Sequence, residues 1–181
     1  MMGVKNGDQA AFCELVKMHQ NAVIGTVAKM LSNASEAEDI AQQVFLRLWK
    51  SAPRYEAKAK FTTFLFTIAR NLVFNETRRK QRRKEHSLEE KEENSFSEMA
   101  DQHSPAPDNE ILKMELRAQV DNAIQALPQK QRMAVILRRY ENMPYEQIAE
   151  VLELSVPAVK SQLFRARTKL RELLSDYLSN D

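Results

Sequence analysis

Hydrophobic residues recur every three or four positions along nearly the whole chain. This spacing places them on one face of an α-helix, whereas a half-buried strand alternates apolar and polar residues. No convincing stretch of period two occurs in the sequence. The pattern therefore predicts an all-α fold.

The first part of the chain predicts three helices, over about 8–31, 36–51 and 61–84. We expect Ser35 to cap the second helix, with Glu38 as its capping-box partner, and Pro53 to close it. The third helix starts with apolar and aromatic residues and becomes basic toward its end. The inward stripe of the first helix is expected to hold Leu15, Ala22, Val23, Val27 and Met30.

The last part of the chain predicts four more helices, the last two over 145–152 and about 156–176. Pro128 suits the first turn of the helix that ends near residue 140. We expect Ser155 to be the N-cap of the last helix, with Pro157 in its first turn. The short helix, the turn and the long helix would form a helix-turn-helix.

The segment 85–110 between these parts is acidic and Ser-rich and contains Pro105 and Pro107. It carries a net charge of −8, whereas residues 1–84 carry +8. So polar a segment cannot bury enough surface to offset its ordering entropy. The sequence therefore predicts two small helical domains, 1–84 and 111–181, joined by a flexible acidic linker. The charge asymmetry indicates a polyanionic partner, although a solvated basic surface is the open alternative.

Several function classes are excluded by composition. The chain has three glycines, none beyond Gly25, so it lacks the Gly-rich turns of P-loops and dinucleotide sites. Its single Cys and three His show no zinc spacing, and we expect Cys13 to be a buried, inert thiol. No catalytic constellation stands out, so we expect no enzyme, no cofactor and no metal. No apolar run reaches the roughly 18 residues of a membrane span, and a cytoplasmic location is expected.

The helix-turn-helix at 145–171 is the first candidate site. The outward face of its long helix offers cations for phosphates and forked donors for guanine edges in the major groove. An ordinary helical hairpin with a basic solvent face is the alternative. The outward residues are Lys160, Ser161, Phe164 and Arg165, with Arg167 and Arg171 near the edge.

The helix 61–84 is the second candidate, because aromatic rings precede a run of cations that includes Arg78 and Arg79. Rings stack unpaired bases and cations follow the backbone of a single strand. Core packing is the favoured alternative for Phe61 and Phe64, and a solvated helix end is the alternative for the cations.

The outward face of helix 36–51 is the third candidate, since it mixes an acid, amides and large apolar groups as a protein-binding surface does. A contact within the molecule is the alternative, and Trp49 is expected to be packed. The face holds Asp39, Gln42, Gln43, Leu46, Arg47, Trp49 and Lys50.

Three stretches together resemble the extracytoplasmic-function (ECF) group of the sigma-70 family of bacterial RNA polymerase sigma factors. EAEDIAQQVFLRLWK (36–50) resembles the family's polymerase-binding helix. FTTFLFTIARNLVFNETRRKQRR (61–83) resembles the segment that melts and reads the −10 promoter element. The stretch 127–172 resembles the domain that reads the −35 element.

The resemblance implies a promoter-specificity subunit that binds core RNA polymerase, recognises both elements and promotes strand opening for transcription initiation. It places the face of helix 36–51 on the polymerase, and Lys160, Ser161, Phe164 and Arg165 on the −35 duplex, with Arg167 and Arg171 on phosphates. It also implies an anti-sigma factor as a further partner. The residues it places on the single-stranded −10 element are Phe61, Thr62, Thr63, Phe64, Arg70, Asn71, Arg78 and Arg79.

Two positions depart from the family's usual pattern. Phe64 stands where Trp is usual, which could soften strand stacking. Glu153 stands in the helix-turn-helix turn where Gly is frequent, and a positive φ would strain it, so a local difference in the turn is expected. The alternative function is a free-standing helix-turn-helix regulator that dimerises through residues 1–84.

Overall fold

The structure is a computed structural model that describes residues 1–57, 59–90 and 108–175, and every regular element in these ranges is helical. The all-α prediction is confirmed. No helix in these ranges is long and apolar enough to cross a membrane. In chain order the elements are α1 (Met2–Lys5), α2 (Gln9–Leu31), α3 (Ala34–Ser51), the 3-10 helix η1 (Ala52–Arg54), α4 (Phe61–Glu90), α5 (Asp108–Gln125), α6 (Gln129–Arg139), α7 (Tyr145–Leu152) and α8 (Val156–Leu173).

Side-chain caps set the helix starts. Ser155 caps α8 as predicted, because its hydroxyl accepts a hydrogen bond from the backbone N–H of Ala158 at 3.3 Å. The predicted cap of α3 is wrong. Asn33 holds that position, and its side chain accepts from the N–H of Glu36 at 3.1 Å. Because Asn33 already has the extended backbone of an N-cap, Ser35 falls inside the helix.

Helix α4 is longer than predicted, ending at Glu90 rather than near residue 84, and α5 begins at Asp108. Residues 85–90 and 108–110, expected in the linker, are therefore helical. Residues 85–90 continue the turn pattern of α4 without a Pro or Gly to stop it. The rest of the predicted linker, 91–107, lies outside the described residues.

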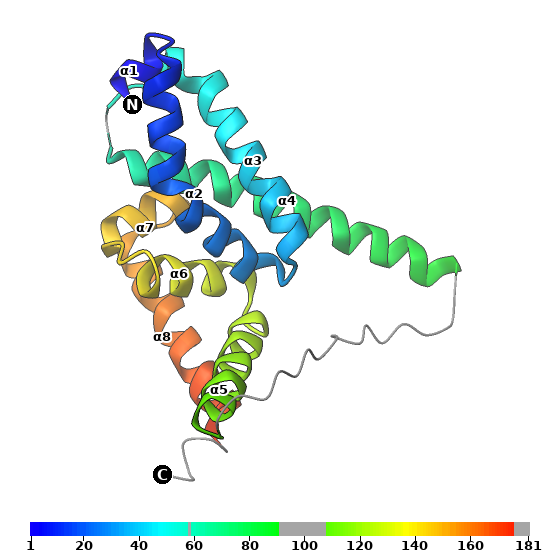
Figure 1. The fold of residues 1–181 in the computed structure, drawn as a ribbon. Helices are drawn as coiled ribbons and strands as arrows, with labels where there is room; N and C mark the ends of the chain where they lie inside the picture. Colours follow the sequence, from blue (N-terminus) through cyan, green and yellow to red (C-terminus); the bar gives the residue numbers. More distant parts are fainter. Residues whose placement is uncertain (58, 91–107, 176–181) are drawn as a thin grey trace.

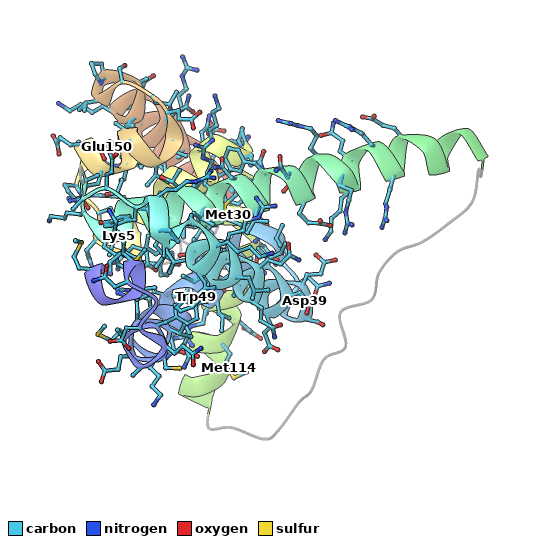
Figure 2. The ribbon with its side chains drawn as sticks, turned by 90° about the horizontal axis from the view of Figure 1, so that it is seen from above. Lys5, Met30, Asp39, Trp49, Met114 and Glu150 are labelled. Atoms are coloured by element: carbon cyan, nitrogen blue, oxygen red, sulfur yellow. The ribbon has the colours of Figure 1, made fainter. Side chains whose placement is uncertain are left out.

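Helices α2, α3 and α4 pack side by side around a shared core, with α1 and η1 at one end (Figure 1). The interior holds Val27, Leu48 and Leu65, each fully buried. The second half of α4 projects beyond this core, so its side chains reach out from the body of the molecule (Figure 2).

Helices α6, α7 and α8 form the second packed group, with α5 alongside α8 (Figure 1). Leu137, Ile148 and Val159, one from each of α6, α7 and α8, are fully buried there. Arg138 orders the turn before α7, because its guanidinium donates to the carbonyl of Met143 at 3.1 Å and lies over the ring of Tyr145.

The two groups contact each other. Helix α7 lies against α4, and the end of α5 and the start of α6 cap the C-terminal end of α2. Gln125 donates to the carbonyl of Lys29 at 2.5 Å, and Arg132 donates to the carbonyl of Met30 at 2.8 Å. A helix leaves its last carbonyls unpaired, so these donors satisfy groups that burial would otherwise penalise. The buried apolar residues of both groups join in one cluster.

Candidate polymerase and nucleic-acid interfaces

The outward face of α8 is exposed, as the helix-turn-helix prediction requires. Val159 and Ala166 are buried on the inner side. Lys160, Ser161 and Arg165 are exposed on the outer side, and Phe164 keeps 70% of its surface accessible. The ring of Phe164 is therefore accessible among exposed cations on the outer side of α8.

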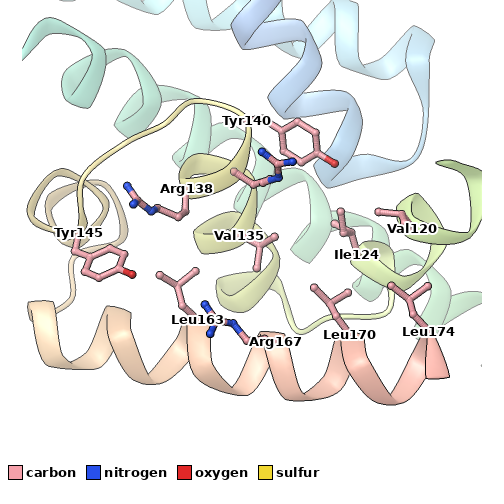
Figure 3. Close-up of a pocket in the computed structure, with 11 residues that line it drawn as sticks. Val120, Ile124, Val135, Arg138, Tyr140, Tyr145, Leu163, Arg167, Leu170 and Leu174 are labelled. Carbon is pink, nitrogen blue, oxygen red and sulfur yellow. The ribbon is translucent and has the colours of Figure 1, made fainter. Parts of the chain in front are cut away.

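Arg167 is exposed at the edge of this face. Together with Leu163 and Leu170 it lines a groove of about 770 Å³ between α5, α6 and α8 (Figure 3). Positions 163, 167 and 170 recur at helical spacing, so they share one side of α8. The structure therefore places Arg167 on a different side of α8 from Arg165, and both Arg167 and Arg171 are exposed.

The turn of the helix-turn-helix keeps the left-handed conformation despite Glu153. This residue has φ 54° and ψ 48° at the C-terminus of α7, so the expected local difference in the turn is not seen. Its carboxylate is held 2.5 Å from the guanidinium of Arg70 on α4. This hydrogen bond and the charge of Arg70 lower the pKa of Glu153 below its ordinary value.

The outward face of α3 is open. Asp39, Gln42 and Gln43 are exposed, and Leu46 keeps 59% of its surface accessible. Trp49 is half-buried at the edge of this face, with its ring 4.9 Å from that of Phe12. The structure thus brings the predicted polymerase-binding residues together on one helix.

The residues predicted to contact the −10 strand divide between two sides of α4. Phe64 and Asn71, seven positions apart, open onto a cleft of about 380 Å³. The end of α3 and η1 supply Arg47, Lys50 and Arg54 to this cleft. Sequence analysis placed Arg47 and Lys50 on the outward face of helix 36–51 rather than beside the start of α4, and it missed Arg54.

Thr63 and Arg70, also seven positions apart, lie on the side of α4 that α7 covers. Both are buried, and the side chain of Arg70 is only 10% exposed. Glu150 of α7 lines a small cavity with Thr63 and Thr67. The sequence drew attention to Glu153 only as a departure in the turn. No sequence signal could have placed Glu150 or Glu153 beside α4, because α7 reaches α4 only through tertiary packing.

The start of α4 is packed rather than open. The ring of Phe61 lies 5.2 Å from that of His19, and the ring of Phe64 lies 5.1 Å from that of Tyr55. Burial lowers the pKa of His19. Both Phe61 and Phe64 are half-buried, and so is Thr62, so each phenylalanine combines a packing contact with an accessible edge.

The projecting half of α4 carries the basic run. Arg78, Arg82 and Arg83 are exposed. Arg79 pairs with Glu76 at 2.8 Å, and Lys80 pairs with Glu36 of α3. The side chain of Arg78 is therefore open to solvent, whereas the charge of its neighbour Arg79 is partly neutralised by Glu76.

One predicted environment is wrong. Cys13 is exposed on α2 rather than buried, because two positions along a helix place it on the opposite side from Leu15 of the inward stripe. No cluster of three or more metal-ligating side chains occurs within residues 1–57, 59–90 and 108–175.

Models of known protein families match both halves of the chain. The family model of Sigma-70 region 2 matches residues 15–83, and that of Sigma-70, region 4 matches residues 117–170. The first match contains the faces of α3 and α4 described above. The second contains the helix-turn-helix.

Similar proteins match over almost the full length. The RNA polymerase sigma-H factor of Pseudomonas aeruginosa is 33% identical over 177 residues, which are 97% of this chain and 92% of the relative. The ECF RNA polymerase sigma factor SigW of Bacillus subtilis is 31% identical, covering 96% of this chain and 94% of the relative. The ECF sigma-E factor of Escherichia coli K12 is 32% identical, covering 91% and 86%.

Two solved structures share the fold at 24% identity. RpoE of Bartonella quintana, in complex with the anti-sigma factor NepR, superposes with a TM-score of 0.68 over 91% of this chain and 97% of that one. CnrH, in complex with the cytosolic domain of CnrY, superposes with a TM-score of 0.71 over 96% and 93%.

The chain contains Sigma-70 region 2 as well as the helix-turn-helix of region 4. The matches therefore favour a sigma factor over the alternative of a free-standing regulator. The chain belongs to the extracytoplasmic-function group of the sigma-70 family of RNA polymerase sigma factors, non-enzymatic subunits that direct the polymerase to promoters for transcription initiation.

Proposed function

We propose that three separate surfaces of this sigma factor divide the work of initiation. The outward face of α3 binds core RNA polymerase, α4 binds the −10 strand, and the outward face of α8 reads the −35 duplex. The main observation that supports this proposal is that apolar side chains are exposed on two of these surfaces, Leu46 on α3 and Phe164 on α8. Binding that covers these side chains removes apolar surface from water, which favours association.

The cleft beside α4 is suited to an unpaired base. Phe64 and Ile68 supply apolar walls, Asn71 supplies an amide that donates and accepts hydrogen bonds, and Arg54 lies among the cations at the rim. A base flipped out of the duplex needs an apolar surface for its ring and polar groups for its pairing edge. The cations would hold the flanking phosphates.

On α8 we assign base contacts to Arg165 and Lys160 and a phosphate contact to Arg171. Arginine can donate two hydrogen bonds to a guanine edge. Arg167, which is exposed at the edge of this face and also lines the groove of Figure 3, is assigned a phosphate contact as well.

We also infer an anti-sigma factor as a regulatory partner. The support is that both structural neighbours were solved with an inhibitory or cytosolic partner bound, NepR on RpoE and CnrY on CnrH. The action of a sigma factor on RNA polymerase places its work in the cytoplasm. A candidate anti-sigma protein should displace core polymerase from this chain in a co-elution assay.

The first test is co-elution with core RNA polymerase on a size-exclusion column. Wild-type protein should form a one-to-one complex, and Asp39→Arg with Gln43→Arg should abolish it. Glu115→Arg with Asn122→Arg makes the same change of charge on exposed positions of α5 and serves as the matched control. A complex that survives the α3 substitutions, or is lost equally in the control, contradicts the assignment of the α3 face.

A further inference from the structure

Helix α1 contacts the segment that leads into α4. It lies at one end of the first helical group, beside η1 (Figure 1). The ammonium of Lys5 donates a hydrogen bond to the backbone carbonyl of Tyr55, 50 positions away, at 2.9 Å. Tyr55 follows η1 with an extended backbone, so its carbonyl takes no part in the hydrogen bonding of that helix. Lys5 therefore holds the chain at the point where it turns from η1 toward α4.

Close packing fixes α1 on the first helical group. Val4 is 1% exposed and belongs to the buried apolar cluster. Gly3 lies against α2, because a Cβ added at Gly3 would come within 3.1 Å of the Cβ of Ala11. In so closely packed a contact, a larger side chain at this position has to move α1. The place of Lys5 is therefore set by packing as well as by its hydrogen bond.

Tyr55 in turn supports the start of α4. Its side chain is 7% exposed, and its ring lies 5.1 Å from the ring of Phe64. Phe64 is an apolar wall of the cleft proposed for an unpaired base, and Arg54, the residue before Tyr55, lines the same cleft. A shift of the backbone at Tyr55 would therefore move a wall and a cation of this cleft together.

We propose that Lys5 is a positioning residue for the −10 strand: its hydrogen bond to Tyr55 holds Phe64 and Arg54 in the arrangement that accepts an unpaired base. Lys5 acts from outside the cleft, since the described residues that line it come from α3, η1 and α4. The inference rests on the proposed function, which assigns this cleft to the −10 strand. A site that is already held in its binding arrangement loses less conformational freedom when its ligand binds.

The test measures the anisotropy of two fluorescent single-stranded oligodeoxynucleotides with the full chain. One has a mixed base sequence, and the other has the same length but abasic sites throughout, so it offers only the sugar-phosphate backbone. Lys5→Met keeps an apolar stem and removes the donor. We expect Lys5→Met to weaken binding of the base-bearing strand about three- to tenfold, as follows when about a third to a tenth of the molecules keep the cleft arranged. Binding of the abasic strand should not change.

Three controls separate positioning from charge. Lys5→Arg keeps a charged donor and should restore the wild-type affinity. Lys17→Met removes the same charge from an exposed site on α2 and should leave the preference for the base-bearing strand as it is. A lysine that binds a phosphate of a single strand contributes about 0.7 to the slope of log affinity against log salt, so this slope should be the same for Lys5→Met and the wild type.

A second variant moves α1 while leaving Lys5 in the sequence. Gly3→Val adds a side chain at the close contact with Ala11 and should cause the same selective loss of affinity for the base-bearing strand. Hydrogen exchange gives an independent measurement. The amide of Tyr55 bonds to the carbonyl of Ala52 at 3.0 Å, and it should exchange faster in Lys5→Met than in Lys17→Met.

Unchanged affinity for the base-bearing strand in both Lys5→Met and Gly3→Val would overturn the inference. An equal loss of affinity for both strands would also overturn it, as would a smaller salt slope in Lys5→Met, which means a direct phosphate contact. The proposed function fails in a different way. Wild-type protein would then bind the base-bearing and abasic strands equally, and Phe64→Ala would change neither affinity.

Discussion

The hydroxyl of Thr26 on α2 donates a hydrogen bond to the carboxylate of Glu141, 115 positions away, at 3.2 Å. Thr26 is buried, and Glu141 lies in the turn between α6 and α7. Burial raises the pKa of Glu141, and the hydrogen bond from Thr26 opposes this only in part. Each of these polar groups, one in each half of the chain, therefore has its hydrogen-bond partner in the other half.

This pair makes stability depend on pH with a defined sign. A carboxyl whose pKa is raised by folding favours the folded state below its ordinary pKa, and that contribution is lost as pH rises through the raised value. Glu141→Gln keeps an oxygen for Thr26 and cannot ionise. We expect it to increase stability at neutral pH by less than about 1 kcal/mol, since the site is partly solvated, and to have no advantage at acid pH. Thermal unfolding across pH measures this, and Glu146→Gln, at an exposed position of α7, is the control.

The positive φ of Glu153 leads us to expect different stabilities for two substitutions that both remove its carboxylate. Glycine adopts a positive φ without strain, whereas an alanine there keeps a cost of about 1–2 kcal/mol. Glu153→Gly should therefore be more stable than Glu153→Ala by about 1 kcal/mol. Chemical denaturation of the full chain compares them. Equal stabilities would mean that the turn relaxes to another conformation.

Two leucines on α3 separate folding from binding. Leu48 is fully buried and Leu46 is 59% exposed. Leu48→Ala should lower the free energy of unfolding by about 2–5 kcal/mol through lost burial and a residual cavity. Leu46→Ala should change it by no more than about 0.5 kcal/mol yet weaken co-elution with core polymerase. Leu46→Ala that binds polymerase as wild type does would remove this side chain from the proposed interface.

Helix α8 carries two cations, Arg165 and Lys169, whose substitutions can be compared. Arg165 is exposed on the outward face, whereas Lys169 pairs with Glu172 at 3.1 Å. With promoter duplexes selected by the wild-type holoenzyme, Arg165→Ala should cost about 1–3 kcal/mol of discrimination at one base pair. Lys169→Ala should leave the preferred base unchanged. Selection of the same duplexes by the Arg165→Ala holoenzyme would argue against direct readout by this residue.

Sequence analysis predicted correctly those features that depend on residues close together in the chain, such as a side chain that caps the helix it precedes. The bounds of α7 and the cap of α8 at Ser155 follow from residues within one turn of each other. The same reasoning failed for α3, because Asn33 and Ser35 are both good caps and the left-handed Ser32 that ends α2 puts Asn33 first. Periodicity placed Leu15 correctly but left Cys13, two residues away, to be settled by the packing of α2.

The sequence by itself determined the helices, the order of the three candidate surfaces and the family, because periodicity, caps and motifs are properties of neighbouring residues. Only the tertiary structure decided that Arg70 is covered by Glu153, that Arg167 lines a groove and that the end of α2 is capped by Gln125 and Arg132. These pairings join residues up to 102 positions apart. No local pattern encodes them, since they arise from how two amphipathic helical groups bury their remaining apolar surface against each other.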